Sequence, residues 1–169
     1  MRGGRNTKRR GAGTMLRNMA TVFLFNEDKL LMLKRSADKA FNPGVWSVIV
    51  GHIESHEWKN PLATALRELS EETGFSESDL IDINFRYILI REARDEIRMQ
   101  YVFVAKTDRR DFRDSNEGEL YWVPKEDILS KNMTVTIYNS LKHYLEHGNG
   151  DGVTVGVFDK DGRVVWSKI

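Results

Sequence analysis

Hydrophobic residues alternate with polar turns along most of the chain, and this pattern predicts a fold that combines strands with helices. Asn26-Glu27-Asp28 separates two apolar runs and favours a hairpin, and Asn42-Pro43-Gly44 predicts a turn. Six runs have the length and composition of strands: about 21–25, 29–35, 46–50, 81–91, 97–107 and 120–123.

Two stretches have the spacing of amphipathic helices. Asn60 followed by Pro61 predicts a helix start, and Gly74 is suited to end that helix after Thr73. A second helix is expected over 134–147. Strands, helix, strands and helix in this order predict an α/β protein, with a mixed sheet that carries one helix on each face.

The two ends of the chain differ from this central region, which spans residues 15–147. Residues 1–14 carry five Arg and Lys residues and no acid, and we expect them to be flexible. They are interpreted either as a nucleic-acid-binding arm or as sequence upstream of a natural start at Met15. Residues 148–169 predict a glycine-rich linker followed by a β-hairpin, which packs on the domain or on a second subunit in a homodimer.

The composition of the chain excludes several classes of protein. The chain has 169 residues and no cysteine, which excludes disulfides and cysteine nucleophiles and suits the cytoplasm. The longest uncharged stretch, 40–53, is too short and too polar to cross a bilayer, so we expect no membrane partner. Residues after 14 hold 21 basic against 25 acidic side chains, so we expect no nucleic-acid partner for the folded part.

One helix face carries an unusual cluster of charge. At about 100° per residue, Glu68, Glu71 and Glu72 fall in an arc beside the apolar face of the helix over 61–73. Like charges at these spacings destabilise a helix by about 0.2–0.5 kcal/mol a pair, and the helix dipole disfavours anions in its C-terminal half. A divalent cation would convert this repulsion into binding. Oxygen ligands alone indicate Mg²⁺, or Mn²⁺, rather than zinc.

The segment around these glutamates resembles the signature of the Nudix hydrolases, the MutT-like pyrophosphohydrolases. That signature is G-x5-E-x7-R-E-U-x-E-E-x-G-U, where U is a bulky apolar residue. The chain has Gly51, Glu57 and the complete run Arg67–Phe75. It departs from the signature by having nine residues rather than seven between Glu57 and Arg67. The resemblance covers about residues 19–147.

The resemblance implies an α/β/α sandwich around a mixed sheet, followed here by the C-terminal hairpin. It implies that Glu68, Glu71 and Glu72 bind catalytic Mg²⁺ together with a backbone carbonyl of Val50 or Gly51. It implies that Arg67 orients these glutamates, and that a later carboxylate, Glu117 or else Glu119, is a further ligand or the general base. Arg35 is a candidate for contacting a phosphate, and Phe41 for stacking on a base.

The implied reaction is hydrolysis of a diphosphate bond in a small molecule, a nucleoside diphosphate linked to another group. A nucleoside triphosphate cleaved to the monophosphate and pyrophosphate fits a compact domain. Two alternatives share the fold: a non-catalytic nucleotide sensor, which typically lacks signature glutamates, and an isopentenyl diphosphate isomerase, which usually needs a cysteine. The sequence leaves open the identity of the linked group and whether Glu68 or Glu117 is the base.

Overall fold

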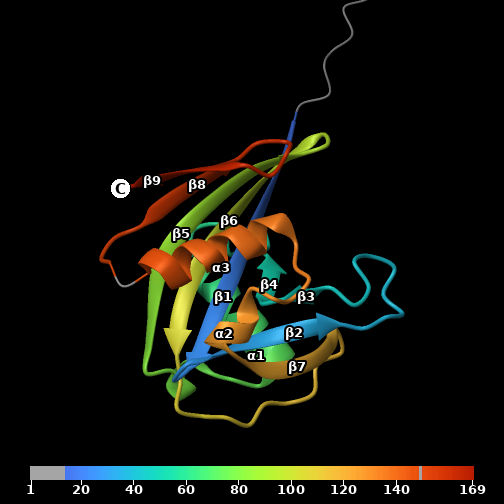
Figure 1. The fold of residues 1–169 in the computed structure, drawn as a ribbon, viewed down its shortest axis with the longest axis vertical. Helices are drawn as coiled ribbons and strands as arrows, with labels where there is room; N and C mark the ends of the chain where they lie inside the picture. The colour runs from blue at the N-terminus through green and yellow to red at the C-terminus, as the bar shows by residue number, and fades with distance from the viewer. Residues whose placement is uncertain (1–13, 149) are drawn as a thin grey trace, which may run out of the picture.

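The computed structural model describes residues 14–148 and 150–169, so the predicted flexible segment lies outside the described residues except for Thr14. A mixed sheet of nine strands forms the centre of the molecule (Figure 1). The strands are β1 (Met15–Asn26), β2 (Lys29–Arg35), β3 (Trp46–Ser47), β4 (Ile49–His52), β5 (Asp82–Ala93), β6 (Glu96–Lys106), β7 (Gly118–Pro124), β8 (Thr154–Phe158) and β9 (Val164–Lys168). The helices are α1 (Pro61–Thr73), the 3-10 turn η1 (Glu77–Asp79), α2 (Lys125–Ile128) and α3 (Val135–His147).

Strand β1 organises the sheet. It pairs with β6 in parallel along nearly its whole length, and β6 pairs with β5 in an antiparallel hairpin. On its other edge β1 pairs with β4 over residues 19–22 and with β2 only at its end. Strand β2 then pairs with β3 and β7. Strands β2 and β4 therefore pair with different parts of the same edge of β1, so the sheet divides there. Strand β4 ends beside this division.

Alternate residues of the strands supply two cores, one on each face of the sheet. Phe23 and Phe25 of β1 pack in the core beneath α3, whereas Val22 and Leu24 pack in the core beneath α1. Figure 1 shows α3 in front of the sheet and α1 behind it. The predicted α/β/α sandwich is thus confirmed. No helix in the described part of the chain has the length and hydrophobicity needed to span a bilayer.

The local signals of α1 act as predicted. Asn60 accepts a hydrogen bond from the Ala63 amide at 3.3 Å, Pro61 occupies the first turn, and the helix ends at Thr73. Gly74 follows with φ of 77°, a left-handed conformation that favours glycine. Ala65 and Leu69 are buried under the sheet, so the opposite side of this helix is left for polar contacts.

Two strands differ from their predicted form. β1 begins at Met15 rather than near Thr21, because its first half, which is less buried than the second, is held by the parallel partner β6. The predicted strand over 46–50 is two strands separated at Val48. The break arises because β3 pairs with β2 and β4 pairs with β1, so the chain changes partners between them.

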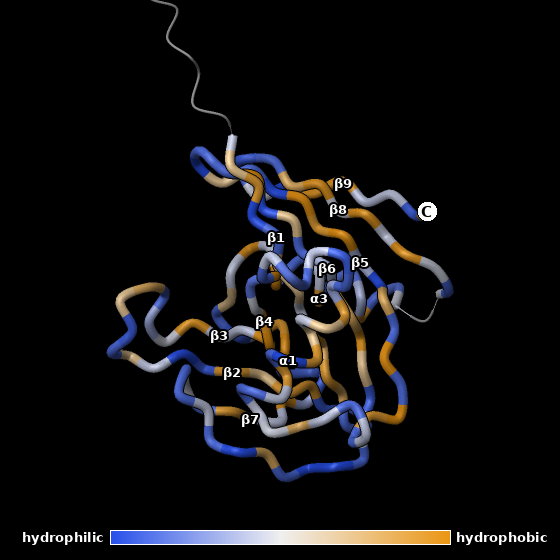
Figure 2. The backbone as a smooth tube through the Cα atoms, turned by 180° about the vertical axis from the view of Figure 1, so that it is seen from behind, coloured by the Kyte–Doolittle hydropathy of each residue, from blue (hydrophilic) through white to orange (hydrophobic). Residues whose placement is uncertain are grey.

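The C-terminal hairpin extends the sheet instead of standing apart from it. Strand β8 pairs in parallel with β5 from Tyr87 to Arg91, and β9 closes the hairpin on β8. Trp166 contacts Tyr87 and Phe158 edge-on, with ring centroids 5.7 and 6.1 Å apart. Figure 2 shows hydrophobic colouring along β8 and β9, in line with this contact to the α3 core.

Candidate active site

The predicted glutamates line one cavity beside the end of β4. The cavity has a volume of about 500 Å³, and its walls come from β4, from α1 and from the segment before β7. The structure brings together most of the predicted site residues here: Arg35, Gly51, Glu68, Glu71, Glu72 and Glu117. Ser115 and Asn116 complete the wall, and no signal in the sequence singled them out.

Arg67 lies behind this cavity and is fixed by Glu57. Its Nε and Nη2 donate to the two carboxylate oxygens of Glu57 at 2.8 and 3.0 Å. The Thr64 hydroxyl donates to the same carboxylate at 2.8 Å. These hydrogen bonds, those from Arg67 above all, lower the pKa of the buried Glu57 to about 2. Glu57 therefore braces Arg67 despite the two additional residues between them.

Arg67 in turn holds two of the signature glutamates. Its Nη1 donates to Glu68 at 2.7 Å and to Glu71 at 3.3 Å. Its Nη2 also donates to the His52 carbonyl at 3.1 Å, which ties α1 to the end of β4. The guanidinium thus links both carboxylates to the strand, an arrangement that fits the orienting role implied by the resemblance.

The close approach of α1 to β4 depends on Gly51. A Cβ atom at this position would collide with Glu68 Cδ, so a larger residue would displace that carboxylate. Burial, opposed by the hydrogen bond from Arg67, raises the pKa of Glu68 above its ordinary value. The backbone of Gly51 and the Glu68 carboxylate therefore share one end of the cavity.

Glu72 is the most constrained carboxylate of the site. Among the described residues, its Oε2 is buried and has no hydrogen-bond partner. Burial, and then the nearby charges of Glu68 and Glu117, raise the pKa of Glu72 to about 8. An unpartnered buried carboxylate oxygen is costly unless a cation compensates it. Glu72 thus has an environment that suits a cation ligand.

Glu117 enters the cavity from the opposite side with two cations beside it. Its carboxylate lies 3.3 Å from Lys39 Nζ and 3.9 Å from Arg35 Nη1. Both cations come from β2 or the segment that follows it, so this side of the cavity is basic and the α1 side is acidic. Such a cavity can hold a phosphate chain between a cation-binding wall and a basic wall.

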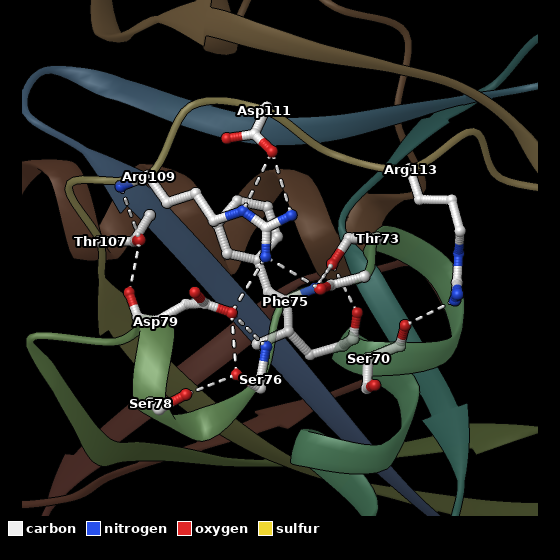
Figure 3. Close-up of polar contacts among 12 residues, drawn as sticks. Ser70, Thr73, Phe75, Ser76, Ser78, Asp79, Thr107, Arg109, Asp111 and Arg113 are labelled. Atoms are coloured by element: carbon white, nitrogen blue, oxygen red, sulfur yellow. Dashed lines mark hydrogen bonds and ion pairs between the residues drawn. The ribbon is translucent and has the colours of Figure 1, made fainter.

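The segment that carries Glu117 is anchored to the C-terminal end of α1 (Figure 3). Arg113 Nη2 donates to the carbonyls of Ser70 and Glu71, both at 2.9 Å. Arg109 stacks on Phe75 at 4.8 Å and donates to the Gly74 carbonyl at 3.1 Å. Figure 2 shows this connection before β7 as mostly hydrophilic. Polar contacts therefore hold a long loop against α1 and position Glu117 opposite Glu72.

Two candidate residues lie away from this cavity. Phe41 is 66% exposed in the loop after β2 and lines an adjoining cavity of about 460 Å³, which also contains Arg35. Glu119, the second choice for the later carboxylate, accepts a hydrogen bond from the Tyr121 hydroxyl and does not line the carboxylate cavity. The structure thus favours Glu117 over Glu119.

The donors present fit a hard divalent cation. Three glutamates and the backbone of Val50 and Gly51 line the cavity, and all of these offer oxygen atoms. In the described part of the chain no three acidic or histidine side chains already converge on one point, and Glu68 is turned toward Arg67. The buried, unpartnered Glu72 oxygen is the observation that points to a cation.

Comparisons with known proteins agree with the fold and the signature. The NUDIX domain family model matches residues 15–144. A curated protein of Lactococcus lactis subsp. cremoris, named a probable DHNTP pyrophosphohydrolase, is 34% identical over 86 residues. That match covers 49% of this chain and 48% of the relative, so the chain matches about half of the relative's length.

Solved structures show the same fold at low sequence identity. The MutT protein of Bacillus halodurans superimposes with a TM-score of 0.68 and 21% identity, covering 89% of this chain and 96% of its own. An Ap4A hydrolase of C. elegans superimposes with a TM-score of 0.65 and 20% identity, covering 80% of this chain and 99% of its own. Both matches extend over most of this chain and show that it has the same fold.

Proposed function

Because the chain belongs to the Nudix family, we propose that it is an Mg²⁺-dependent hydrolase that cleaves the diphosphate bond of a nucleoside diphosphate linked to another group. Mn²⁺ is the alternative ion, since it prefers the same oxygen ligands. The observation that carries the proposal is the carboxylate wall of the cavity. Glu68, Glu71 and Glu72 line it together, and one buried oxygen of Glu72 has no partner among the described residues.

The residues of the two walls have different proposed roles, one binding the cation and the other binding phosphate. Glu68, Glu71 and Glu72 would hold Mg²⁺ with a carbonyl oxygen of Val50 or Gly51. Bound there, the ion would neutralise phosphate charge and favour ionisation of a water molecule. Arg35 and Lys39 on the basic wall would bind non-bridging phosphate oxygens. The diphosphate would then be held across the cavity with its phosphorus atoms between the two walls.

Glu117 is our candidate for the general base. A water oxygen attacks one phosphorus atom, and the Glu117 carboxylate accepts the proton that the water loses. The bond between that phosphorus and the bridging oxygen breaks, and its electron pair leaves with the second phosphate. Two phosphate products and one released proton balance the reaction. Glu117 suits this role because its side chain is 43% exposed, so water can reach it.

Names of similar proteins support a polyphosphate substrate. The Lactococcus relative is named a probable DHNTP pyrophosphohydrolase, and one structural neighbour is an Ap4A hydrolase. We therefore place nucleoside triphosphates and dinucleoside polyphosphates first among the substrates to test. A triphosphate would yield the monophosphate and pyrophosphate.

A substrate panel tests the proposed function. The full chain is incubated with nucleoside triphosphates, diadenosine tetraphosphate, ADP-ribose and nucleotide sugars, with Mg²⁺, with Mn²⁺ or with EDTA. Phosphate, pyrophosphate and nucleoside monophosphate release are measured. We expect cleavage at a diphosphate bond that EDTA abolishes. Cleavage of none of these compounds with either ion would overturn the proposal.

A further inference from the structure

Three arginines form a row across the middle of the sheet. Arg17 of β1 is paired with Arg98 of β6, and Arg98 is paired with Arg91 of β5. Residues paired in this way on adjacent strands project from the same face of a sheet. Like charges directly opposite one another destabilise strand pairing, so this arrangement is unfavourable for the fold alone.

One carboxylate only partly neutralises the row. Glu96 accepts from Arg98 Nε at 2.6 Å and pairs with Arg17 Nε at 3.1 Å. Arg91 Nη1 donates to the Thr136 hydroxyl at 3.2 Å, and within the described residues Arg91 has no carboxylate partner. Burial and the charge of Arg98 lower the pKa of Arg91. Three guanidinium groups and one carboxylate leave a net charge of +2, which a phosphate monoester of about −1.5 to −2 would balance.

The row faces a cavity that continues the carboxylate cavity. This second cavity, the one of about 460 Å³ that Phe41 lines, contains Arg17, Arg91 and Arg98. The two cavities share Arg35, Ser47, Val50 and His52. Among the described residues the ionisable side chains that line the second cavity are arginines and His52, with no carboxylate, and burial and the nearby arginines lower the pKa of His52. The first turn of α3 also borders it, so backbone amides add to its positive potential. The continuous cleft is acidic at one end and basic at the other, and on their far side the three arginines line a further cavity that also contains Glu92 and Asp95.

We propose that the row of Arg17, Arg91 and Arg98 binds a second phosphate group of the substrate, one that lies beyond the diphosphate being cleaved. This inference rests on the proposed function, because it assigns the substrate a diphosphate at the glutamates and a further phosphate at the arginines. Guanidinium forks match phosphate oxygens in geometry as well as charge. The further phosphate is either a monoester on the linked group or part of a longer polyphosphate chain.

Matched compounds separate these two sources. NADP⁺ and coenzyme A each carry one phosphate monoester that NAD⁺ and dephospho-coenzyme A lack, and diadenosine tetraphosphate has a longer phosphate chain than diadenosine diphosphate. The ratio of kcat/KM within each pair is measured for the wild type, for the double variant Arg91→Gln/Arg98→Gln, and for Arg110→Gln. Arg110 is an exposed arginine paired with Glu27 and serves as the control. This ratio does not depend on the amount of folded enzyme, so the substrate preference of a partly unfolded variant can still be measured.

We expect the wild type to prefer the more phosphorylated member of at least one pair by about 10- to 100-fold, the scale of hydrogen bonds to a charged group. The double variant should lose this preference, and Arg110→Gln should keep it. Preference in the NADP⁺ and coenzyme A pairs would assign a monoester, whereas preference in the diadenosine pair would assign a longer chain. If the double variant does not fold, Arg17→Gln and Arg98→Lys are measured in its place, and each should reduce the preference.

Three other results would overturn the inference or separate it from the proposed function. Cleavage of both members of every pair at equal rates would overturn the inference and leave the proposed function standing. A preference that the arginine variants retain would overturn the assignment to this row. If no compound is cleaved, the proposed function fails, and calorimetric binding of NADP⁺ and NAD⁺ in EDTA then tests the row. Equal affinity for the two would overturn it.

Discussion

Glu57 and Arg67, which are ten positions apart in the sequence, form a bidentate ion pair with hydrogen bonds of 2.8 and 3.0 Å. The pair joins the loop after β4 to the middle of α1. Since Arg67 also bonds Glu68, Glu71 and the His52 carbonyl, this one contact sets the place of the carboxylate wall. The loop between the two residues carries the additional length that separates this chain from the family signature.

Replacing Glu57 with glutamine should lower stability and activity together. Glutamine has the size of glutamate, but one of its two terminal groups is an NH₂ donor rather than an acceptor. One N–H group of Arg67 would therefore face this NH₂ group and lose its hydrogen bond. We expect Glu57→Gln to lower the free energy of unfolding by about 1.5–3 kcal/mol, the scale of a hydrogen bond to a charged group. Denaturant unfolding measures this, with the exposed Glu126→Gln as control. Equal stability of the two variants would contradict the bracing role.

The same pair makes stability depend on pH in acid. Its hydrogen bonds from Arg67 lower the pKa of Glu57 from an ordinary 4.5 to about 2 in the folded protein. The folded state therefore keeps this carboxylate ionised where the unfolded chain protonates it, and the stabilisation is complete only above about pH 4.5. We expect the stability difference between the wild type and Glu57→Gln to shrink as the pH falls from 4.5 toward 2. A constant difference would show that the Glu57 charge contributes nothing.

Features of the fold that are set by residues close together in the sequence could be predicted from the sequence. Asn60, Pro61 and Gly74 act within one helical turn of α1, so the bounds of that helix could be read from the sequence. The same is true of the arc formed by Glu68, Glu71 and Glu72, because helix geometry alone fixes their angular spacing. The structure brings these three glutamates together in one cavity, and their role there stays a prediction.

Contacts between distant segments could not be predicted in this way. The row of Arg17, Arg98 and Arg91 depends on the register of three strands, and β1 pairs with β6 about 80 residues later. The bond between Glu57 and Arg67 depends on how the loop over 54–60 folds back. The hydrophobic pattern of one strand indicates which of its residues face the core, but it does not say which distant strand lies beside it or how a loop closes.

The C-terminal hairpin should stabilise the whole domain. Trp166 packs against Tyr87, Phe158 and His143, and its burial joins β9 to the α3 core. We expect Trp166→Ala to lower the free energy of unfolding by about 2–3 kcal/mol, because much of a large ring loses its contacts. Val165 is the adjacent residue and is 70% exposed, so Val165→Ala is the matched control. Similar losses for both variants would argue against this packing role.

The anchor between Arg113 and α1 should position Glu117. Arg113→Gln removes hydrogen bonds to two carbonyls at the helix end, where a cation is also favoured by the helix dipole. We expect a stability loss of about 0.5–1 kcal/mol and a lower kcat, because the segment that carries Glu117 loosens. Arg110→Gln in the same segment should change neither quantity. An unchanged kcat in Arg113→Gln, on a substrate that the wild type cleaves, would show that the anchor does not affect catalysis.

The activity of Glu72→Gln, on a substrate that the wild type cleaves, tests the central claim most directly. Glutamine keeps the shape of this buried side chain and cannot ionise, and without a cation the pKa of Glu72 is already raised to about 8, so the fold should be as stable as the wild type in EDTA at neutral pH. If the glutamates hold the catalytic cation, kcat should fall by about 10²- to 10⁴-fold with Mg²⁺ present. The exposed Glu77→Gln, as control, should keep wild-type activity. Wild-type kcat in a folded Glu72→Gln variant would contradict catalysis at this carboxylate wall.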